Sequence, residues 1–262
     1  MESLIHPSSY ISSNAKIASD VYIGPFCAIN DNVIIESNSK LISHVCISGN
    51  TIIGKENTFY PFSNIGSIPQ DLKYKGENSS LQIGNKNIFR ENTTVNIGTK
   101  GGGMNTTIGN ECLFMVGSHI AHDCNIGNKV ILANNATLAG HVNINDNAII
   151  GGLAAIHQFV RIGKYAMIGG MSGVEYDIIP YGIYMGIRSN LRGLNLIGLK
   201  RKGLDSKKIN ELQLCFNEIF EKKQPIEENI KKIQSKTNTE EVNDIINFIL
   251  QKSRRGICTP KI

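Results

Sequence analysis

A hydrophobic residue recurs at every sixth position over much of the chain, and this period constrains the fold more than any other feature. The first run is Ile11, Ile17, Ile23, Ile29, Ile35, Leu41, Ile47, Ile53, Phe59 and Ile65; the second is Ile108, Phe114, Ile120, Ile126, Leu132, Leu138, Ile144, Ile150, Ile156, Ile162, Ile168 and Val174. A helix would spread such a period around its surface, whereas short strands joined by turns keep it on one face. The sequence therefore predicts a solenoid with these side chains inside.

Glycine directly follows the repeated residue in many hexads, where we expect a bend with positive φ. These positions are Gly24, Gly54, Gly84, Gly109, Gly127, Gly151, Gly163 and Gly169. Polar segments interrupt the hexads near 67–82 (SIPQDLKYKGENSSLQ) and 99–107 (TKGGGMNTT). Insertions in a solenoid become loops, often on the binding face, so both are candidate substrate loops.

Helix signals replace the six-residue period after Pro180. Asp205 can cap a helix, Pro225 suits a first turn, and Asn238 with Glu241 resembles a capping box. We therefore predict a β-solenoid at residues 1–187 and a small helical domain at residues 188–262.

Composition and charge narrow the class of protein. The chain has neither an N-terminal leader pattern nor an apolar stretch of membrane-spanning length, so we expect a cytoplasmic protein without an integral membrane segment. Its six cysteines lack CxxC spacing and are expected to be reduced. Residues 188–208 hold seven Lys or Arg against one Asp, which indicates either an anionic partner or a solvated face. We expect no cofactor, no metal and no nucleic-acid partner.

Four segments resemble the hexapeptide-repeat acyltransferases, and among them the UDP-N-acetylglucosamine O-acyltransferases. They are HIAHDCNIGNKVILANNATLAGHV at 119–142, IHQF at 156–159, QDLKY at 70–74 and GLNLIGLKRKG at 193–203. The resemblance implies a left-handed parallel β-helix, against the usual right-handed crossover, and a homotrimer. It also implies transfer of a 3-hydroxyacyl group from acyl carrier protein to the 3-hydroxyl of UDP-N-acetylglucosamine, the first step of lipid A synthesis.

The eighteen-residue coil of this family places histidines in neighbouring columns. His122, Gly140 and Gln158 share one column, Asp123 and His141 lie on one side of it, and His157 lies on the other. Transfer to a hydroxyl needs a base, and imidazole titrates in the right range, so we predict that His122 is the general base. Asp123 would hold its useful tautomer, and the Gly140 N–H would bind the oxyanion, the role that this glycine has in the family.

The resemblance also assigns substrate contacts. Asp71, Lys73, His141, His157 and Gln158 would position donor and sugar, Asn195, Arg201 and Lys202 would contact the uridine diphosphate, and Gly170 would form the floor of the acyl channel. His119 lies outside the shared columns, so a structural hydrogen bond and a substrate contact both remain open. The sequence departs from the family pattern at Asn96 (often His), Ile197 (often acidic) and Lys202 (often Arg), which bears on nucleotide contact.

Two other functions remain as alternatives. Carbonic anhydrases of the γ type use the same β-helix and bind zinc with three histidines. However, their H-x4-H spacing is absent, because His119 and His122 are three residues apart. A purely structural solenoid would need no histidine cluster.

Overall fold

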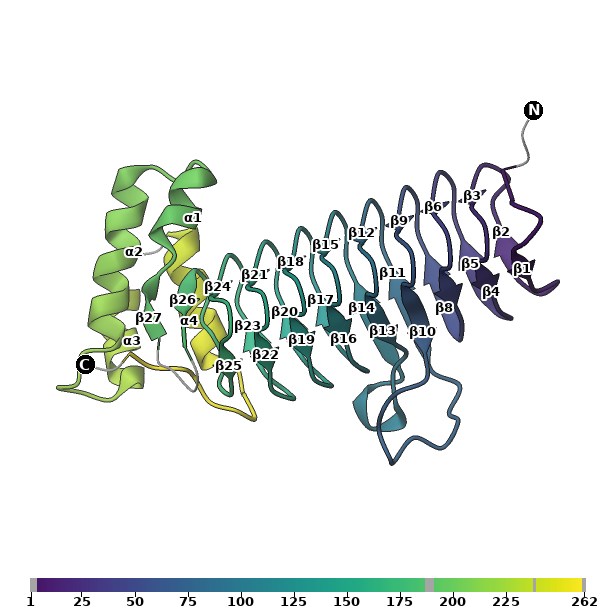
Figure 1. The fold of residues 1–262 in the computed structure, drawn as a ribbon. Helices are drawn as coiled ribbons and strands as arrows, with labels where there is room; N and C mark the ends of the chain where they lie inside the picture. Colours follow the sequence, from purple (N-terminus) through teal and green to yellow (C-terminus); the bar gives the residue numbers. More distant parts are fainter. Residues whose placement is uncertain (1–3, 187–190, 238, 261–262) are drawn as a thin grey trace.

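The computed structural model describes residues 4–186, 191–237 and 239–260, and most of this chain winds into a stack of three-sided coils (Figure 1). Each coil contributes one short strand to each of three parallel sheets. In regular coils the register advances by eighteen residues, as where His119 pairs with Thr137. The architecture is the predicted β-solenoid.

Each of the three sheets forms one side of the coils. Sheet 1 contains β1 (Tyr10–Ile11), β4 (Ala28–Ile29), β7 (Cys46–Ile47), β10 (Asn64–Ser67), β13 (Thr94–Asn96), β16 (His119–Ile120), β19 (Thr137–Leu138), β22 (Ala155–Ile156) and β25 (Gly173–Val174). Sheet 2 contains β2 (Lys16–Ile17), β5 (Val33–Ile35), β8 (Asn50–Ile53), β11 (Ser80–Ile83), β14 (Asn105–Ile108), β17 (Asn125–Ile126), β20 (Asn143–Ile144) and β23 (Arg161–Ile162). Sheet 3 contains β3 (Tyr22–Ile23), β6 (Lys40–Leu41), β9 (Thr58–Phe59), β12 (Ile88–Phe89), β15 (Leu113–Phe114), β18 (Ile131–Leu132), β21 (Ile149–Ile150), β24 (Met167–Ile168), β26 (Gly182–Tyr184) and the antiparallel β27 (Leu191–Leu194).

The repeated hydrophobic residues fill the inside of the coils. From Ile23 onward every member of both runs is buried, and Ile11 and Ile17 in the first coil are partly buried. Phe59, Phe89 and Phe114 stack on one another with ring centroids 4.7 and 4.8 Å apart. This spacing matches the distance between neighbouring strands, so side chains of successive coils pack directly on each other.

The prediction of positive φ at the hexad glycines is wrong. The left-handed residue of each corner lies two positions later, and it is Phe26, Glu56, Lys86, Glu111, Lys129, Leu153, Tyr165 and Met171. Close packing of the coils explains the glycines instead. A Cβ at Gly24 would lie 1.8 Å from the Ile42 carbonyl oxygen of the next coil.

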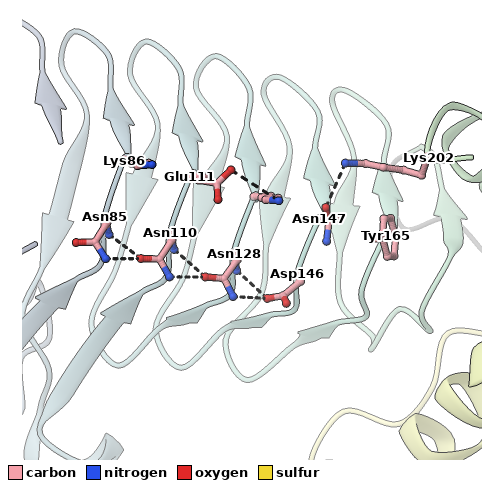
Figure 2. Close-up of a pocket in the computed structure, with 10 residues that line it drawn as sticks. Asn85, Lys86, Asn110, Glu111, Asn128, Asp146, Asn147, Tyr165 and Lys202 are labelled. Carbon is pink, nitrogen blue, oxygen red and sulfur yellow. Dashed lines mark hydrogen bonds and ion pairs between the residues drawn. The ribbon is translucent and has the colours of Figure 1, made fainter. Parts of the chain in front are cut away.

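Amide side chains connect the coils at the corner between sheets 2 and 3 (Figure 2). Asn85 donates to Asn110 at 3.0 Å, Asn110 to Asn128 at 2.8 Å, and Asn128 to Asp146 at 3.2 Å. Each side chain therefore accepts a hydrogen bond from the one before it, and these bonds stabilise the stacking of four coils.

Both insertions leave the β-helix at the corner between sheets 1 and 2. The first connects β10 to β11 and the second connects β13 to β14, where it contains a short 3₁₀ helix, η1 (Lys100–Gly102). Figure 1 shows the two loops projecting from the same place. Strands β11 and β14 begin at Ser80 and Asn105, inside the segments that the sequence marked as insertions.

Helices follow the β-helix, as predicted. They are α1 (Leu196–Arg201), α2 (Ser206–Ile219), α3 (Ile226–Gln234) and α4 (Glu240–Leu250). Asp205 caps α2 by accepting a hydrogen bond from the Lys208 N–H, and Pro225 precedes α3. The predicted Asn238 cap and the predicted boundary at 187/188 lie outside the described residues. Within those residues no helix is long and apolar enough to cross a membrane.

Candidate active site

The corner between sheets 1 and 2 carries the predicted catalytic residues. His122 and Asp123 connect β16 to β17, and Gly140 and His141 connect β19 to β20 one coil later. The two insertions lie at this same corner in preceding coils. The eighteen-residue period therefore brings together residues that are distant in the sequence.

His122 and Asp123 form a buried hydrogen-bonded pair. Asp123 Oδ2 lies 2.8 Å from His122 Nδ1, and both residues are at most 9% exposed. Burial alone would raise the pKa of the Asp123 carboxyl, but hydrogen bonds from His122 and Thr99 outweigh it and lower that pKa. An ionised carboxylate only accepts, so the proton of neutral His122 lies on Nδ1 and Nε2 is left as the base.

The second insertion holds the Asp123 carboxylate. The Thr99 N–H donates to Asp123 Oδ1 at 2.8 Å, and the Thr99 hydroxyl donates to Oδ2 at 2.5 Å. Thr106 Oγ1 accepts from the Asp123 N–H at 2.8 Å. A Cβ at Gly102 would lie 2.0 Å from Asp123 Cγ, so this glycine permits the loop to close on the carboxylate. The predicted substrate loop is thus also a support for the His122–Asp123 pair.

Gly140 packs directly against the His122 ring. A Cβ there would lie 2.6 Å from His122 Nε2, closer than real Cβ contacts allow. Among the described residues nothing accepts a hydrogen bond from the Gly140 N–H, although the His141 N–H donates to the His122 carbonyl at 3.0 Å. Gly140 thus has no side chain to block the His122 ring, contacts that ring, and has an N–H that is free to donate.

Aromatic rings continue the column beyond His122. The His141 ring meets His122 edge-on at 5.0 Å and stacks on Phe159 at 4.3 Å with 7° between the planes. Burial is the main cause that lowers the pKa of His141, against the opposing attraction of the Asp123 carboxylate. The charge of Asp71 in the first insertion also acts on His141, which relates this loop to the same corner.

His119 has a structural partner. Its Nδ1 lies 2.7 Å from Thr94 Oγ1 on the outer face of sheet 1. Burial, followed by the charge of His122, lowers its pKa. The structural hydrogen bond left open by the sequence is therefore present.

Asn96 fixes the base of the first insertion. Its Nδ2 donates to the Ile68 carbonyl at 3.1 Å, and its buried Oδ1 has no hydrogen-bond partner among the described residues. In the insertion itself Asp71 Oδ1 accepts from the Lys73 N–H at 2.9 Å, so this turn is ordered locally and the Lys73 side chain is exposed.

His157 and Gln158 are exposed and contact the C-terminal segment. Arg255 donates from Nε to the Gln158 carbonyl at 2.8 Å, and its Nη2 lies 2.5 Å from His157 Nδ1. His157 therefore faces a guanidinium.

The remaining predicted residues lie on the other two edges of the β-helix. Lys202 Nζ donates to Asn147 Oδ1 at 3.3 Å at the corner between sheets 2 and 3 (Figure 2). Asn195 caps α1 and donates to the Tyr165 carbonyl at the same corner. Gly170 is exposed at the corner between sheets 3 and 1.

Arg201 and Ile197 are exposed residues of α1, and Ile197 is 68% exposed. A single chain therefore does not bring the residues assigned to the nucleotide and the acyl channel together with His122.

Sequence reasoning missed four residues that shape the site: Thr99, Thr106, Phe159 and Arg255. Phe159 was detectable, since it lies eighteen residues after His141. Thr106 was detectable as well, since it lies in β14, eighteen residues before Cys124. Thr99 lies in an insertion and Arg255 beyond the helices, where the repeat gives no register.

The zinc alternative does not fit this geometry. Within the described residues, the cluster that could hold one ion is His122, Asp123 and His141, with ligand atoms within 4.8 Å. Both Asp123 oxygens already accept hydrogen bonds from Thr99, and His157 contacts a cation. The Arg255 guanidinium would repel a zinc ion at His157, which disfavours a three-histidine site that includes this residue.

Family models match two parts of the chain. A model described as UDP-N-acetylglucosamine O-acyltransferase, domain 2, matches residues 177–258, and a bacterial transferase hexapeptide model with six repeats matches residues 105–140.

Relatives match along nearly the whole chain. A Rickettsia bellii protein named acyl-[acyl-carrier-protein]–UDP-N-acetylglucosamine O-acyltransferase is 55% identical, covering 97% of this chain and 91% of its own. A Bartonella bacilliformis protein of the same name is 44% identical, covering 98% and 94%. A crystal structure of a UDP-N-acetylglucosamine acyltransferase superposes with a TM-score of 0.94 at 42% identity, covering 98% and 99%. The enzyme from Campylobacter jejuni gives 0.92 at 37% identity, covering 98% and 100%.

Proposed function

The chain belongs to the UDP-N-acetylglucosamine O-acyltransferase family, and we propose that it transfers a 3-hydroxyacyl group from acyl carrier protein to the 3-hydroxyl of UDP-N-acetylglucosamine, the first step of lipid A synthesis. The fold is the left-handed β-helix that the resemblance implied, followed by the helical domain that the sequence predicted. The observation that carries the proposed chemistry is the buried His122–Asp123 pair packed against Gly140.

His122 acts as the general base. Its Nε2 takes the proton of the sugar hydroxyl as the oxygen attacks the thioester carbon. Asp123 accepts from Nδ1 and stabilises the imidazolium that forms. The tetrahedral intermediate then expels the thiol of the carrier arm, which recovers the proton from His122. No covalent acyl-enzyme is required.

Gly140 stabilises the intermediate. Its backbone packs against the His122 ring, and its N–H, which has no acceptor among the described residues, is offered to the oxyanion at the point where charge develops. Preorganised backbone donors of this kind contribute on the order of 3 kcal/mol to an acyl-transfer barrier.

Three copies of the chain complete the site. The residues assigned to catalysis, to the nucleotide and to the acyl channel lie on three different edges of one β-helix. In a cyclic trimer an edge of one subunit faces a different edge of the next. We therefore propose a homotrimer with sites between neighbouring β-helices, in which Asn195, Arg201, Lys202 and Gly170 reach the His122 corner of another subunit.

The basic segment that follows the β-helix is a candidate surface for the acidic carrier protein. Outside the residues assigned to the nucleotide, Lys200 and Lys207 are exposed there, whereas Lys208 pairs with Glu241 at 2.8 Å. Binding through exposed charges weakens as salt screens them, so the KM for the carrier should rise with ionic strength.

The test is a transfer assay with UDP-N-acetylglucosamine and 3-hydroxyacyl carrier proteins of several chain lengths. The proposal predicts a product in which one acyl group has replaced one hydrogen of the sugar nucleotide, as its mass will show, and release of free carrier thiol in equal amount. Thioester hydrolysis without a sugar product would contradict it.

A further inference from the structure

The C-terminal segment after α4 returns to the active-site corner. In Figure 1 it is the yellow chain that loops below β25. Ser253 donates to the buried Asp177 carboxylate at 2.5 Å, and Asp177 pairs through its backbone with Gly256 and Cys258. Arg161 neutralises Asp177 at 2.6 Å. The segment is therefore anchored at Asp177, by one hydrogen bond to its buried side chain and by two to its backbone.

This anchoring places two arginines at the end of the histidine column. Arg255 is used within the protein, since it donates to Gln158 and faces His157. The Arg254 guanidinium lies 4.8 Å from the Phe159 ring, and Phe159 stacks in turn on His141. Arg254 is exposed, and within the described chain no carboxylate lies at ion-pair distance from it. Its N–H groups are thus available to an anion beside the site.

We propose that Arg254 binds the phosphate of the phosphopantetheine arm that carries the acyl group. A guanidinium held by stacking presents a planar set of donors that suits phosphate oxygens. The inference rests on the proposed function, because it requires a carrier-bound thioester as the donor.

The separation between Arg254 and His122 suits the phosphate of this arm better than the diphosphate of the sugar nucleotide. His122, His141, Phe159 and Arg254 follow one another at separations of 5.0, 4.3 and 4.8 Å. In the sugar nucleotide only a few bonds separate the reacting hydroxyl from the nearest phosphorus. In the donor a long arm separates the thioester from its phosphate, and that arm can span the column.

The experiment compares two probes that differ only in the phosphate: 3-hydroxyacyl pantetheine and 3-hydroxyacyl phosphopantetheine. Their Kd values are measured on the full-length protein without the sugar nucleotide, so that no transfer occurs. The wild type should bind the phosphorylated probe about tenfold more tightly, as one charge-assisted contact implies. Arg254→Gln should bind both probes alike, with the affinity for the unphosphorylated probe unchanged.

Lys231→Gln is the matched control, because it removes the same charge from an exposed position of α3. It should keep the wild-type preference. The proposal is overturned if Arg254→Gln retains the preference, weakens both probes equally, or raises only the KM for UDP-N-acetylglucosamine. Failure of the proposed function would look different, because the wild type would then transfer no acyl group to the sugar nucleotide.

Discussion

Asp123 Oδ2 lies 2.8 Å from His122 Nδ1, and the same carboxylate receives two hydrogen bonds from Thr99. The geometry of the proposed catalytic pair therefore does not depend on the repeat alone. The β-helix corner brings the two residues together, and an inserted loop fixes the carboxylate in its ionised form and in one orientation.

Thr99→Val should lower kcat by about tenfold while changing the KM for either substrate little, because it removes one hydrogen bond to the charged Asp123 without altering side-chain shape much. Thr99→Ser should restore most of kcat, since it keeps the hydroxyl. Thr137→Val is the matched control, at an exposed strand position outside the site. Wild-type kcat in Thr99→Val would show that the loop does not position the pair.

Stability should depend on pH through His119. Burial lowers the pKa of His119, so near pH 6 the unfolded chain binds more protons than the folded one at this residue. The unfolding free energy should therefore rise from pH 5 to pH 7.5, and His119→Gln should reduce this rise. Urea titrations at the two pH values measure it. An unchanged pH dependence in His119→Gln would contradict a lowered pKa of the partly buried His119.

The fold could be predicted because the repeat has a fixed length, which gives the position of each residue in the stack of coils. Once a coil holds eighteen residues, His122 must lie against Gly140, and His141 against Phe159. The corner conformation was not predictable from glycine content, since Asp123 and His141 themselves adopt φ of 59° and 64°. Glycine at the corners reflects contact between coils instead of backbone freedom.

The rest of the site could not be predicted from the sequence. Thr99 reaches Asp123 across twenty-four residues through an insertion that obeys no period, and Arg255 reaches Gln158 across ninety-seven. Such contacts depend on loop closure and on the path of the C-terminal segment, neither of which leaves a local pattern in the sequence.

Gly170→Met should shift the acyl preference toward shorter chains. Gly170 is exposed and its φ is not left-handed, so a side chain can extend from this edge with one tight contact, to the Gly152 carbonyl oxygen at 3.2 Å. Relative kcat/KM for carrier-bound acyl groups of graded length measures the shift. Gly173→Met, at the outer face of β25, is the control. The same chain-length profile in Gly170→Met and wild type would remove Gly170 from the channel.

Two inactive variants should complement each other if neighbouring subunits share sites. His122→Ala supplies an intact Arg201, and Arg201→Ala supplies an intact His122. Random mixing of unfolded subunits in equal amounts, followed by refolding, should restore about a quarter of wild-type activity. Each site takes His122 from one subunit and Arg201 from its neighbour, and each of the two residues is intact in about half of the subunits. Mixing without unfolding is the control. Activity that stays at the level of the separate variants would place both residues in one subunit's site.

The most direct measurement is kcat for acyl transfer by His122→Ala, with UDP-N-acetylglucosamine and a 3-hydroxyacyl carrier protein both saturating. Loss of the general base should lower kcat by at least about a hundredfold. The thermal unfolding midpoint, measured in parallel, should show that the protein remains folded. Transfer at close to the wild-type rate by a folded His122→Ala protein would contradict the mechanism.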